Sequence, residues 1–217
     1  MNVHHVSAEN SVLNQFLVEI RNKSVQQDKL RFRHNLERIG ELLAYEMSKT
    51  LNYDVKEIQT VLGKHQKAVI SDSLVICSIL RAGLPMHNGV CRIFDDVNHS
   101  FISAYRTHNK ANETFDIHIE YCATSDLTSK TLILVDPMLA TGHSIVEVYK
   151  FIAQKFDISS LVILSAIAAK PGVQYLKKHL PKNTQIWIAD IDESLNEKGY
   201  IVPGLGDAGD LAFGPKL

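Results

Sequence analysis

The stretch that decides the fold is TLILVDPMLATGHS, residues 131–144. Its first five residues, 131–135, are predicted to form a strand. Within it LILV, residues 132–135, is apolar on both faces, as in a central strand of a parallel sheet that helices cover on each side. Asp136 follows this predicted strand, and a helix is predicted to begin near Ser144. Amides at the start of a helix have no acceptor within the helix and lie at the positive end of its dipole, so they suit a phosphate. The stretch therefore predicts a phosphate-binding loop beside a carboxylate.

Taken alone, this loop is equally compatible with an ordinary turn in which Asp136 only caps the chain. The pattern GxxxxGK[ST], typical of nucleoside triphosphate sites, and the pattern GxGxxG, typical of dinucleotide sites, are both absent from this loop. We favour a sugar phosphate as the ligand. The amides of residues 140–144 and the hydroxyls of Thr141 and Ser144 would bind the phosphate, while Asp136 accepts hydrogen bonds from ribose hydroxyls.

Helical and β-rich segments alternate on both sides of this loop. The spacing of apolar residues predicts two opening helices, over residues 12–22 and 28–50. Further strands are predicted over 74–80, 100–105, 161–168 and 185–190, and further helices over 84–93, 144–156 and 173–180. This alternation predicts an α/β fold with a central parallel sheet, in which ligands bind beyond the carboxyl ends of the strands. Because no repeat or linker divides the chain, we expect one domain over residues 1–217.

Three further segments bear on the site. Residues 107–122 interrupt the alternation with a polar stretch and then alternating apolar residues, which predicts an arm or hairpin outside the sheet. Arg81 follows the predicted strand 74–80, where a cation needs an anionic ligand or a structural ion pair. The tail GYIVPGLGDAGDLAFG, residues 199–214, holds five of the eleven glycines, so we expect no regular structure in it. Its apolar residues nevertheless favour a folded loop that lines a pocket.

Composition narrows the classes of function. With 23 basic and 24 acidic residues, the chain has no global positive charge for nucleic acid or anionic lipid. The longest apolar run, 161–169, is too short to span a bilayer, and the N-terminus does not resemble a secretory signal, so we expect a cytoplasmic protein. The three cysteines lack the spacing of a disulfide framework or a zinc site, and we assign no metal ligand to any histidine or cysteine.

Three segments together resemble the uracil branch of the type I phosphoribosyltransferases. They are DPMLATGHS (136–144), LRAGLPM (80–86) and GYIVPGLGDAGD (199–210), and RFRHNLERIGELLAYE (31–46) resembles the N-terminal helical segment of that family. The resemblance implies a parallel sheet flanked by helices, a protruding arm at 107–122 and a hood, residues 191–217, that binds the base. It also implies transfer of the 5-phosphoribosyl group from 5-phosphoribosyl-1-pyrophosphate (PRPP) to uracil, giving UMP and pyrophosphate in pyrimidine salvage.

The resemblance also implies roles for individual residues. As catalytic residues it indicates Asp136, Asp207 and Arg106. As residues that bind PRPP it indicates Arg81, Arg106, Asp136, Pro137, Met138, Leu139, Ala140, Thr141, Gly142, His143, Ser144 and Asp207. As residues that bind uracil it indicates Ile201, Gly206, Asp207 and Ala208. Magnesium would arrive with PRPP, and the chain would form a homodimer or a larger homo-oligomer.

Because PRPP is easily hydrolysed, we expect the 107–122 arm to close over the site as a lid. Some positions depart from the family pattern: His143 and Pro85 stand where glycines are usual, and Asn88 where an aspartate is common. The arm also differs from the family's usual acidic sequence. Two alternatives remain: a regulatory protein of the same fold that senses pyrimidine nucleotide and binds RNA, and a transferase for another base. The first needs a basic face, which the net charge of −1 does not indicate.

Overall fold

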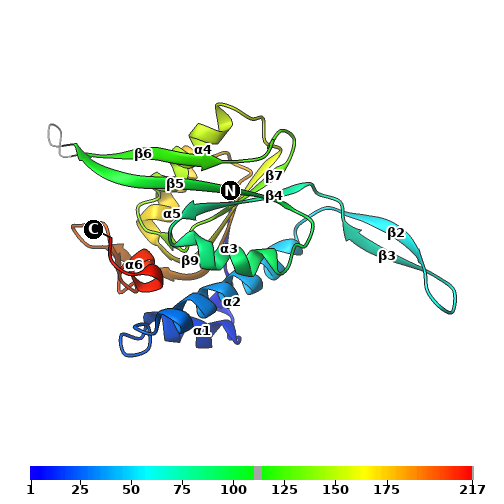
Figure 1. Ribbon diagram of the computed structural model, residues 1–217, viewed down its shortest axis with the longest axis horizontal. Coiled ribbons are helices and arrows are strands. Elements are labelled where there is room, and N and C mark those ends of the chain that lie inside the picture. The colour runs from blue at the N-terminus through cyan, green and yellow to red at the C-terminus, as the bar shows by residue number, and fades with distance from the viewer. Residues whose placement is uncertain (110–113, 217) are drawn as a thin grey trace.

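A central sheet with helices on both faces forms the body of the molecule (Figure 1). The computed structural model describes residues 1–109 and 114–216, and within 105–117 it describes no side chains. The strand order is β1-β10-β9-β7-β4-β5-β6, with β8 paired to β9. The bounds are β1 (Asn2–His5), β4 (Leu74–Leu80), β5 (Asn98–Asn109), β6 (Thr114–Ala123), β7 (Thr131–Val135), β8 (Met138–Leu139), β9 (Ser160–Ala169) and β10 (Gln185–Asp192). Neighbouring strands are parallel, except that β5 and β6 are antiparallel.

Two hydrophobic cores lie on opposite faces of this sheet. One core contains residues of α1 (Leu13–Arg21), α2 (Lys29–Ser48) and α3 (Gly83–Cys91), and the other contains residues of α4 (His143–Ala153) and α5 (Lys170–His179). Successive residues of β7 alternate between the cores: Ile133 and Val135 enter the first, and Leu132 and Leu134 the second. Both faces of β7 are therefore apolar because a hydrophobic core covers each of them, as predicted.

Helix α3 lies very close to α2, and two glycines permit the approach. A Cβ added to Gly89 would lie 1.9 Å from the carbonyl oxygen of Glu37, and one added to Gly40 would lie 2.4 Å from that of Met86. Any side chain at either position would force the helices apart. This close packing fixes α3, whose first residue stands two positions after Arg81.

The predicted central strands and helices are confirmed, but the structure corrects four expectations. No element was predicted for the N-terminus, but it forms a strand: β1 pairs with β10, and the ring of His4 stacks on Trp187 at 3.8 Å. The hairpin β2 (Tyr53–Gln59) and β3 (Lys64–Ile70) was not predicted, and it protrudes from the body (Figure 1). The arm expected outside the sheet is instead the end of β5 with β6, the edge strand of the main sheet. Its residues 110–113 lie outside the described part of the chain.

The tail is the fourth correction, because it contains regular structure. After β11 (Ser194–Leu195) the chain forms the short strand β12 (Ile201–Val202) and the helix α6 (Ala208–Phe213). Leu205 and Ala212 are buried, so the preference for a folded tail over a disordered one is confirmed. Among the described residues, no helix combines the length and apolar character needed to cross a membrane.

Candidate active site

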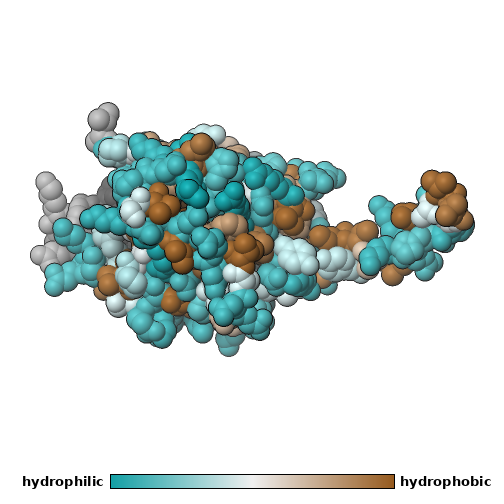
Figure 2. Space-filling view, turned by 90° about the horizontal axis from the view of Figure 1, so that it is seen from below, coloured by the Kyte–Doolittle hydropathy of each residue, from teal (hydrophilic) through white to brown (hydrophobic). Residues whose placement is uncertain are grey.

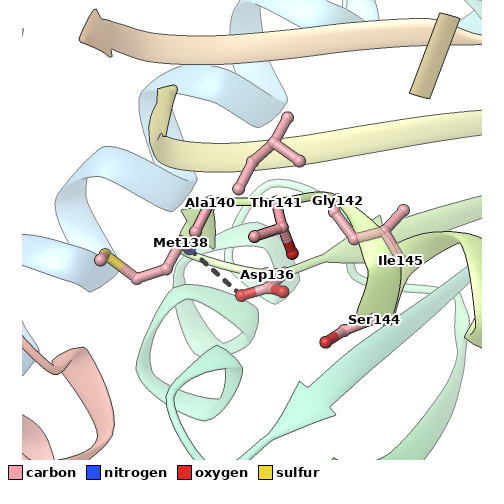
Figure 3. A pocket seen from close by; sticks show the side chains of 8 residues that line it. Asp136, Met138, Ala140, Thr141, Gly142, Ser144 and Ile145 are labelled. Carbon is pink, nitrogen blue, oxygen red and sulfur yellow. Dashed lines mark hydrogen bonds between the residues drawn. The ribbon is translucent and has the colours of Figure 1, made fainter. Parts of the chain in front are cut away.

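The loop after β7 forms a small pocket with Asp136 at its edge. The backbone N–H of Asp136 donates to the carbonyl oxygen of Leu164 at 3.1 Å, and its Oδ1 accepts from the N–H of Met138 at 3.1 Å. The lining residues are Asp136, Met138, Leu139, Ala140, Thr141, Gly142, Ser144 and Ile145. Figure 3 shows the carboxylate of Asp136 and the hydroxyls of Thr141 and Ser144 around one space. The predicted arrangement of strand, acid, loop and helix is therefore present.

A buried hydroxyl, which the sequence analysis missed, holds this loop on the sheet. Ser165 in β9 accepts from the N–H of Leu139 at 3.2 Å and donates to the carbonyl oxygen of Ile167 at 3.0 Å. The same part of β9 pairs with β8. Because Ser165 is 26 positions from Leu139, no local pattern marks it as part of the site.

Helix α5 supports the loop from behind through two glycines. Gly142, the residue before α4, has a φ of 82°, a left-handed conformation that favours glycine. A Cβ added to Gly142 would lie 3.0 Å from the carbonyl oxygen of Gly172. A Cβ added to Gly172 would lie only 2.1 Å from the carbonyl oxygen of Ala140. The loop backbone and the start of α5 are therefore in direct contact.

Two departures from the family pattern are accommodated. The ring of His143 lies 4.2 Å from that of Tyr175 in α5, centroid to centroid, so the imidazole packs on a neighbouring helix. His143 is not among the eight residues that line the pocket. Pro85 is the third residue of α3, in the first turn, where a backbone N–H would have no acceptor within the helix. The backbone of the phosphate loop and of α3 thus forms with these residues in place.

Arg81 joins the end of β4 to the tail. Its Nη2 donates to Oδ1 of Asp210 at 2.9 Å and its Nη1 to the carbonyl oxygen of Gly214 at 3.3 Å. The anionic partner that its position required is therefore a carboxylate of α6. Its Nε is buried and has no hydrogen-bond partner among the described residues. A guanidinium has five N–H donors, so the ion pair leaves Arg81 capacity for a further anion.

The tail itself is anchored by residues that the sequence analysis did not single out. Arg33 donates to the carbonyl oxygen of Ala212 at 2.7 Å, and Arg21 donates to that of Gly204 at 3.0 Å. Arg21 also forms ion pairs with Asp190 and Asp192, each at 2.8 Å. Burial acts to raise the pKa of Asp190, but Arg21 and His5 outweigh it, so the pKa lies below its ordinary value. Arg21 and Asp192 both hydrogen-bond to the backbone of Gly204, and so they hold the turn between Ile201 and Gly206.

The four residues predicted to bind uracil lie within one short segment. Ile201 and Ala208 are buried, and they share a core with Met138 and Ala140 of the phosphate loop. Gly206 has a φ of 99°, and a Cβ built there meets nothing within 4 Å. The Oδ1 of Asp207 accepts from the N–H of Asp210 at 3.0 Å and so caps α6. The tail segment and these two loop residues therefore lie on the same face of the sheet.

Arg106, which is predicted to contact PRPP, lies in the edge strand pair β5–β6. Its backbone lies in β5, paired with Ile117 of β6, and its side chain lies outside the described part of the chain. In Figure 1 the far end of this strand pair extends toward the side of the molecule that carries α6.

Comparisons with known proteins agree with this arrangement. A sequence model described as "Uracil phosphoribosyltransferase" matches residues 6–215. The uracil phosphoribosyltransferase of Porphyromonas gingivalis is 49% identical over 217 residues, which is 100% of both chains. That of Thermococcus gammatolerans is 36% identical over 206 residues, 94% of this chain and 89% of that one.

Solved structures extend the comparison to the fold. The AQ2163 protein of Aquifex aeolicus matches with a TM-score of 0.86 and 28% identity over 99% of each chain. A hypoxanthine phosphoribosyltransferase of Staphylococcus aureus matches with a TM-score of 0.51 and 14% identity, covering 86% of this chain and 83% of that one. The second likeness concerns the fold alone.

Proposed function

The chain belongs to the uracil phosphoribosyltransferase family, and on that premise we propose how its residues carry out the transfer. The enzyme joins uracil to the 5-phosphoribosyl group of PRPP and releases pyrophosphate. The bond from the anomeric carbon to the diphosphate oxygen breaks, a bond to a uracil nitrogen forms, and that nitrogen loses its proton. Because the transition state has oxocarbenium character, the site must stabilise the departing diphosphate and exclude water.

The loop after β7 binds the phosphoribosyl end of the donor. The first amides of α4, together with the hydroxyls of Thr141 and Ser144, donate to the 5-phosphate, and Asp136 accepts from the ribose hydroxyls. The pocket lined by these residues is the observation that carries this assignment. Arg81, with donors left beyond its pair with Asp210, contacts the diphosphate, and Arg106 approaches it from β5. Magnesium enters as part of the PRPP substrate, and no side chain is assigned to it.

The hood, residues 191–217, presents uracil beside the donor. Backbone groups of the segment that contains Ile201, Gly206 and Ala208 match the carbonyls and ring N–H of uracil. The open space at Gly206 is consistent with a flat ring lying against the backbone there. Cytosine would leave a donor or acceptor of this segment unpaired, which strongly disfavours its binding.

An assay with a panel of bases tests the function itself. With PRPP and magnesium, we expect UMP from uracil and no nucleotide from cytosine, hypoxanthine or adenine. If another base is converted as fast as uracil or faster, the assignment of uracil as the specific substrate is wrong. Binding of UMP and RNA without any turnover would favour the regulatory alternative.

Asp207→Asn is expected to lower kcat for UMP formation at least tenfold while the melting temperature stays unchanged. Asparagine caps a helix as well as aspartate does, so α6 keeps the hydrogen bond from the N–H of Asp210. Only the negative charge near the donor is lost. The matched control is Asp28→Asn, which keeps the analogous cap on Arg31 at the start of α2. If both variants turn over like the wild type, Asp207 has only a structural role.

We also propose that the protein is a cytoplasmic homo-oligomer, as befits a salvage enzyme, and that the β2–β3 hairpin contacts a second copy. Every residue of both strands is exposed, and Val61 and Leu62 at the tip are 100% and 98% exposed. Figure 2 shows the apolar tip at the end of the protrusion. A two-stranded hairpin is marginally stable alone, and exposed apolar side chains gathered at its tip suit a protein contact.

Replacement of Val61 and Leu62 together by Asp is expected to reduce the molar mass measured by light scattering to that of a smaller assembly. The matched control replaces Gln59 and Gln66 of the same hairpin by Asp, which leaves the apolar tip intact. An unchanged mass for the double tip variant would place the contact between copies elsewhere.

For the β5–β6 end we propose closure over the bound donor. The support is its direction in Figure 1, toward the side that carries α6, together with the need to keep water from PRPP.

A further inference from the structure

Two histidines and a cysteine meet where α3 packs on β5. His87 and Cys91 lie one turn apart on α3, and His99 lies near the start of β5. The Nε2 of His87 is 3.1 Å from Nδ1 of His99, and Sγ of Cys91 is 3.6 Å from the same Nδ1. All three ligand atoms lie within 4.8 Å of one another. These side chains serve no step of the transfer proposed above.

The separations fit the coordination shell of zinc. Tetrahedral Zn²⁺ binds imidazole nitrogen at about 2.0–2.1 Å and thiolate sulfur at about 2.3 Å, which places two nitrogens roughly 3.3 Å apart and nitrogen and sulfur about 3.6 Å apart. The two pairs that involve His99 already have these separations. The Nε2 of His87 and the Sγ of Cys91 lie within 4.8 Å of each other, and a side-chain adjustment that shortens this distance to about 3.6 Å would complete the shell.

A buried serine orients the central ligand. His87 is 3% exposed, and its Nδ1 lies 2.7 Å from Oγ of the fully buried Ser78 in β4. A hydrogen bond from Nδ1–H to Ser78 leaves the lone pair of Nε2 directed at His99 and Cys91. Ligating histidines almost always have such a partner on the other ring nitrogen. The ring of Phe101 packs on His87 at 4.9 Å, centroid to centroid, and shields it from water.

We propose that Nε2 of His87, Sγ of Cys91 and Nδ1 of His99 bind one Zn²⁺ ion, with water as the fourth ligand. The mixture of thiolate and imidazole favours this borderline-soft cation over magnesium, which prefers oxygen. His99 is exposed, so the ion and its water reach the site from solvent. Bound zinc would tie the end of α3 to β5 and so stiffen the helix that follows Arg81. Sequence analysis assigned no metal here because the third ligand comes from a different element.

Titration of the metal-free, reduced full-length chain with Co²⁺ tests the proposal. We expect one Co²⁺ per chain, with a thiolate-to-cobalt absorption in the near ultraviolet and visible bands typical of tetrahedral cobalt, both abolished by one equivalent of Zn²⁺. Cys91→Ser removes the near-ultraviolet band, and His99→Gln weakens binding at least tenfold. The matched controls are Cys122→Ser, another partly exposed thiol, and His65→Gln on the exposed hairpin, which bind like the wild type.

Several outcomes would overturn the proposal. One is the absence of a stoichiometric thiolate-to-cobalt band in the wild-type protein, a result that depends on no variant. Another is a band that survives Cys91→Ser or disappears in Cys122→Ser. Circular dichroism of each variant and its rate of UMP formation show whether a lost band reflects lost folding. Because the readout is metal binding, failure of the site leaves the proposed transferase function unaffected.

Discussion

Asp136→Asn is expected to lower kcat/KM for PRPP by about a hundredfold or more, which corresponds to roughly 3 kcal/mol of lost transition-state stabilisation. One carboxylate oxygen accepts from the N–H of Met138 at 3.1 Å, and Figure 3 shows the other on the side of Thr141 and Ser144. Asparagine keeps an oxygen for Met138 and tolerates the same turn. It replaces the second oxygen with an amide donor and removes the negative charge, so the ribose hydroxyls lose their acceptor.

The measurement is initial-rate UMP formation at saturating uracil with PRPP varied. The matched control is Asp126→Asn, because Asp126 accepts from the N–H of Thr128 at 2.9 Å in the same kind of turn on the surface. We expect the control to retain wild-type kinetics and both variants to retain the wild-type melting temperature. Turnover of Asp136→Asn within a few-fold of the wild type would remove Asp136 from the catalytic residues.

The parts of the fold that sequence predicted are those with strong local patterns. Strands β4 and β7 were predicted to the residue, because each is a short apolar run buried on both faces. The β2–β3 hairpin has no buried residue, so no apolar periodicity marks it. Helix α6 was missed because glycines dominate its surroundings. It is stabilised by the cap from Asp207 and by Arg33, a residue 179 positions from its partner Ala212.

In the candidate site, too, the features with a local sequence pattern were predicted and those that depend on distant residues were not. The loop from Asp136 to Ser144 is continuous in sequence, so its form followed from the order of strand, acid, glycine and helix. The partner of Arg81 is 129 positions away, and the sequence could require an anion without indicating which one. The direction of the His143 side chain depends on Tyr175 of another helix, which local pattern does not reveal. Contacts between residues far apart in the sequence thus determine the features of the site that the sequence did not predict.

The support that α5 provides to the phosphate loop leads to the second large effect. A Cβ at Gly172 would lie 2.1 Å from the carbonyl oxygen of Ala140 and 3.2 Å from that of Leu139. Both obstacles are backbone atoms, so Gly172→Ala must displace the loop or the start of α5. Overpacking of this kind costs about 1–3 kcal/mol of the free energy of unfolding. A displacement near 1 Å at the phosphate site can reduce the rate by about a hundredfold.

For Gly172→Ala we therefore expect kcat/KM for PRPP to fall by roughly ten- to a hundredfold, measured well below the lowered melting temperature. Gln174→Ala is the matched control, because Gln174 is exposed on the same helix and its truncation leaves the loop untouched. A lower melting temperature with wild-type kcat/KM would show that the loop keeps its position without α5. We expect both the melting temperature and kcat/KM to fall, because the carbonyl oxygen of Ala140 belongs to the same short loop whose amides we propose to bind the phosphate.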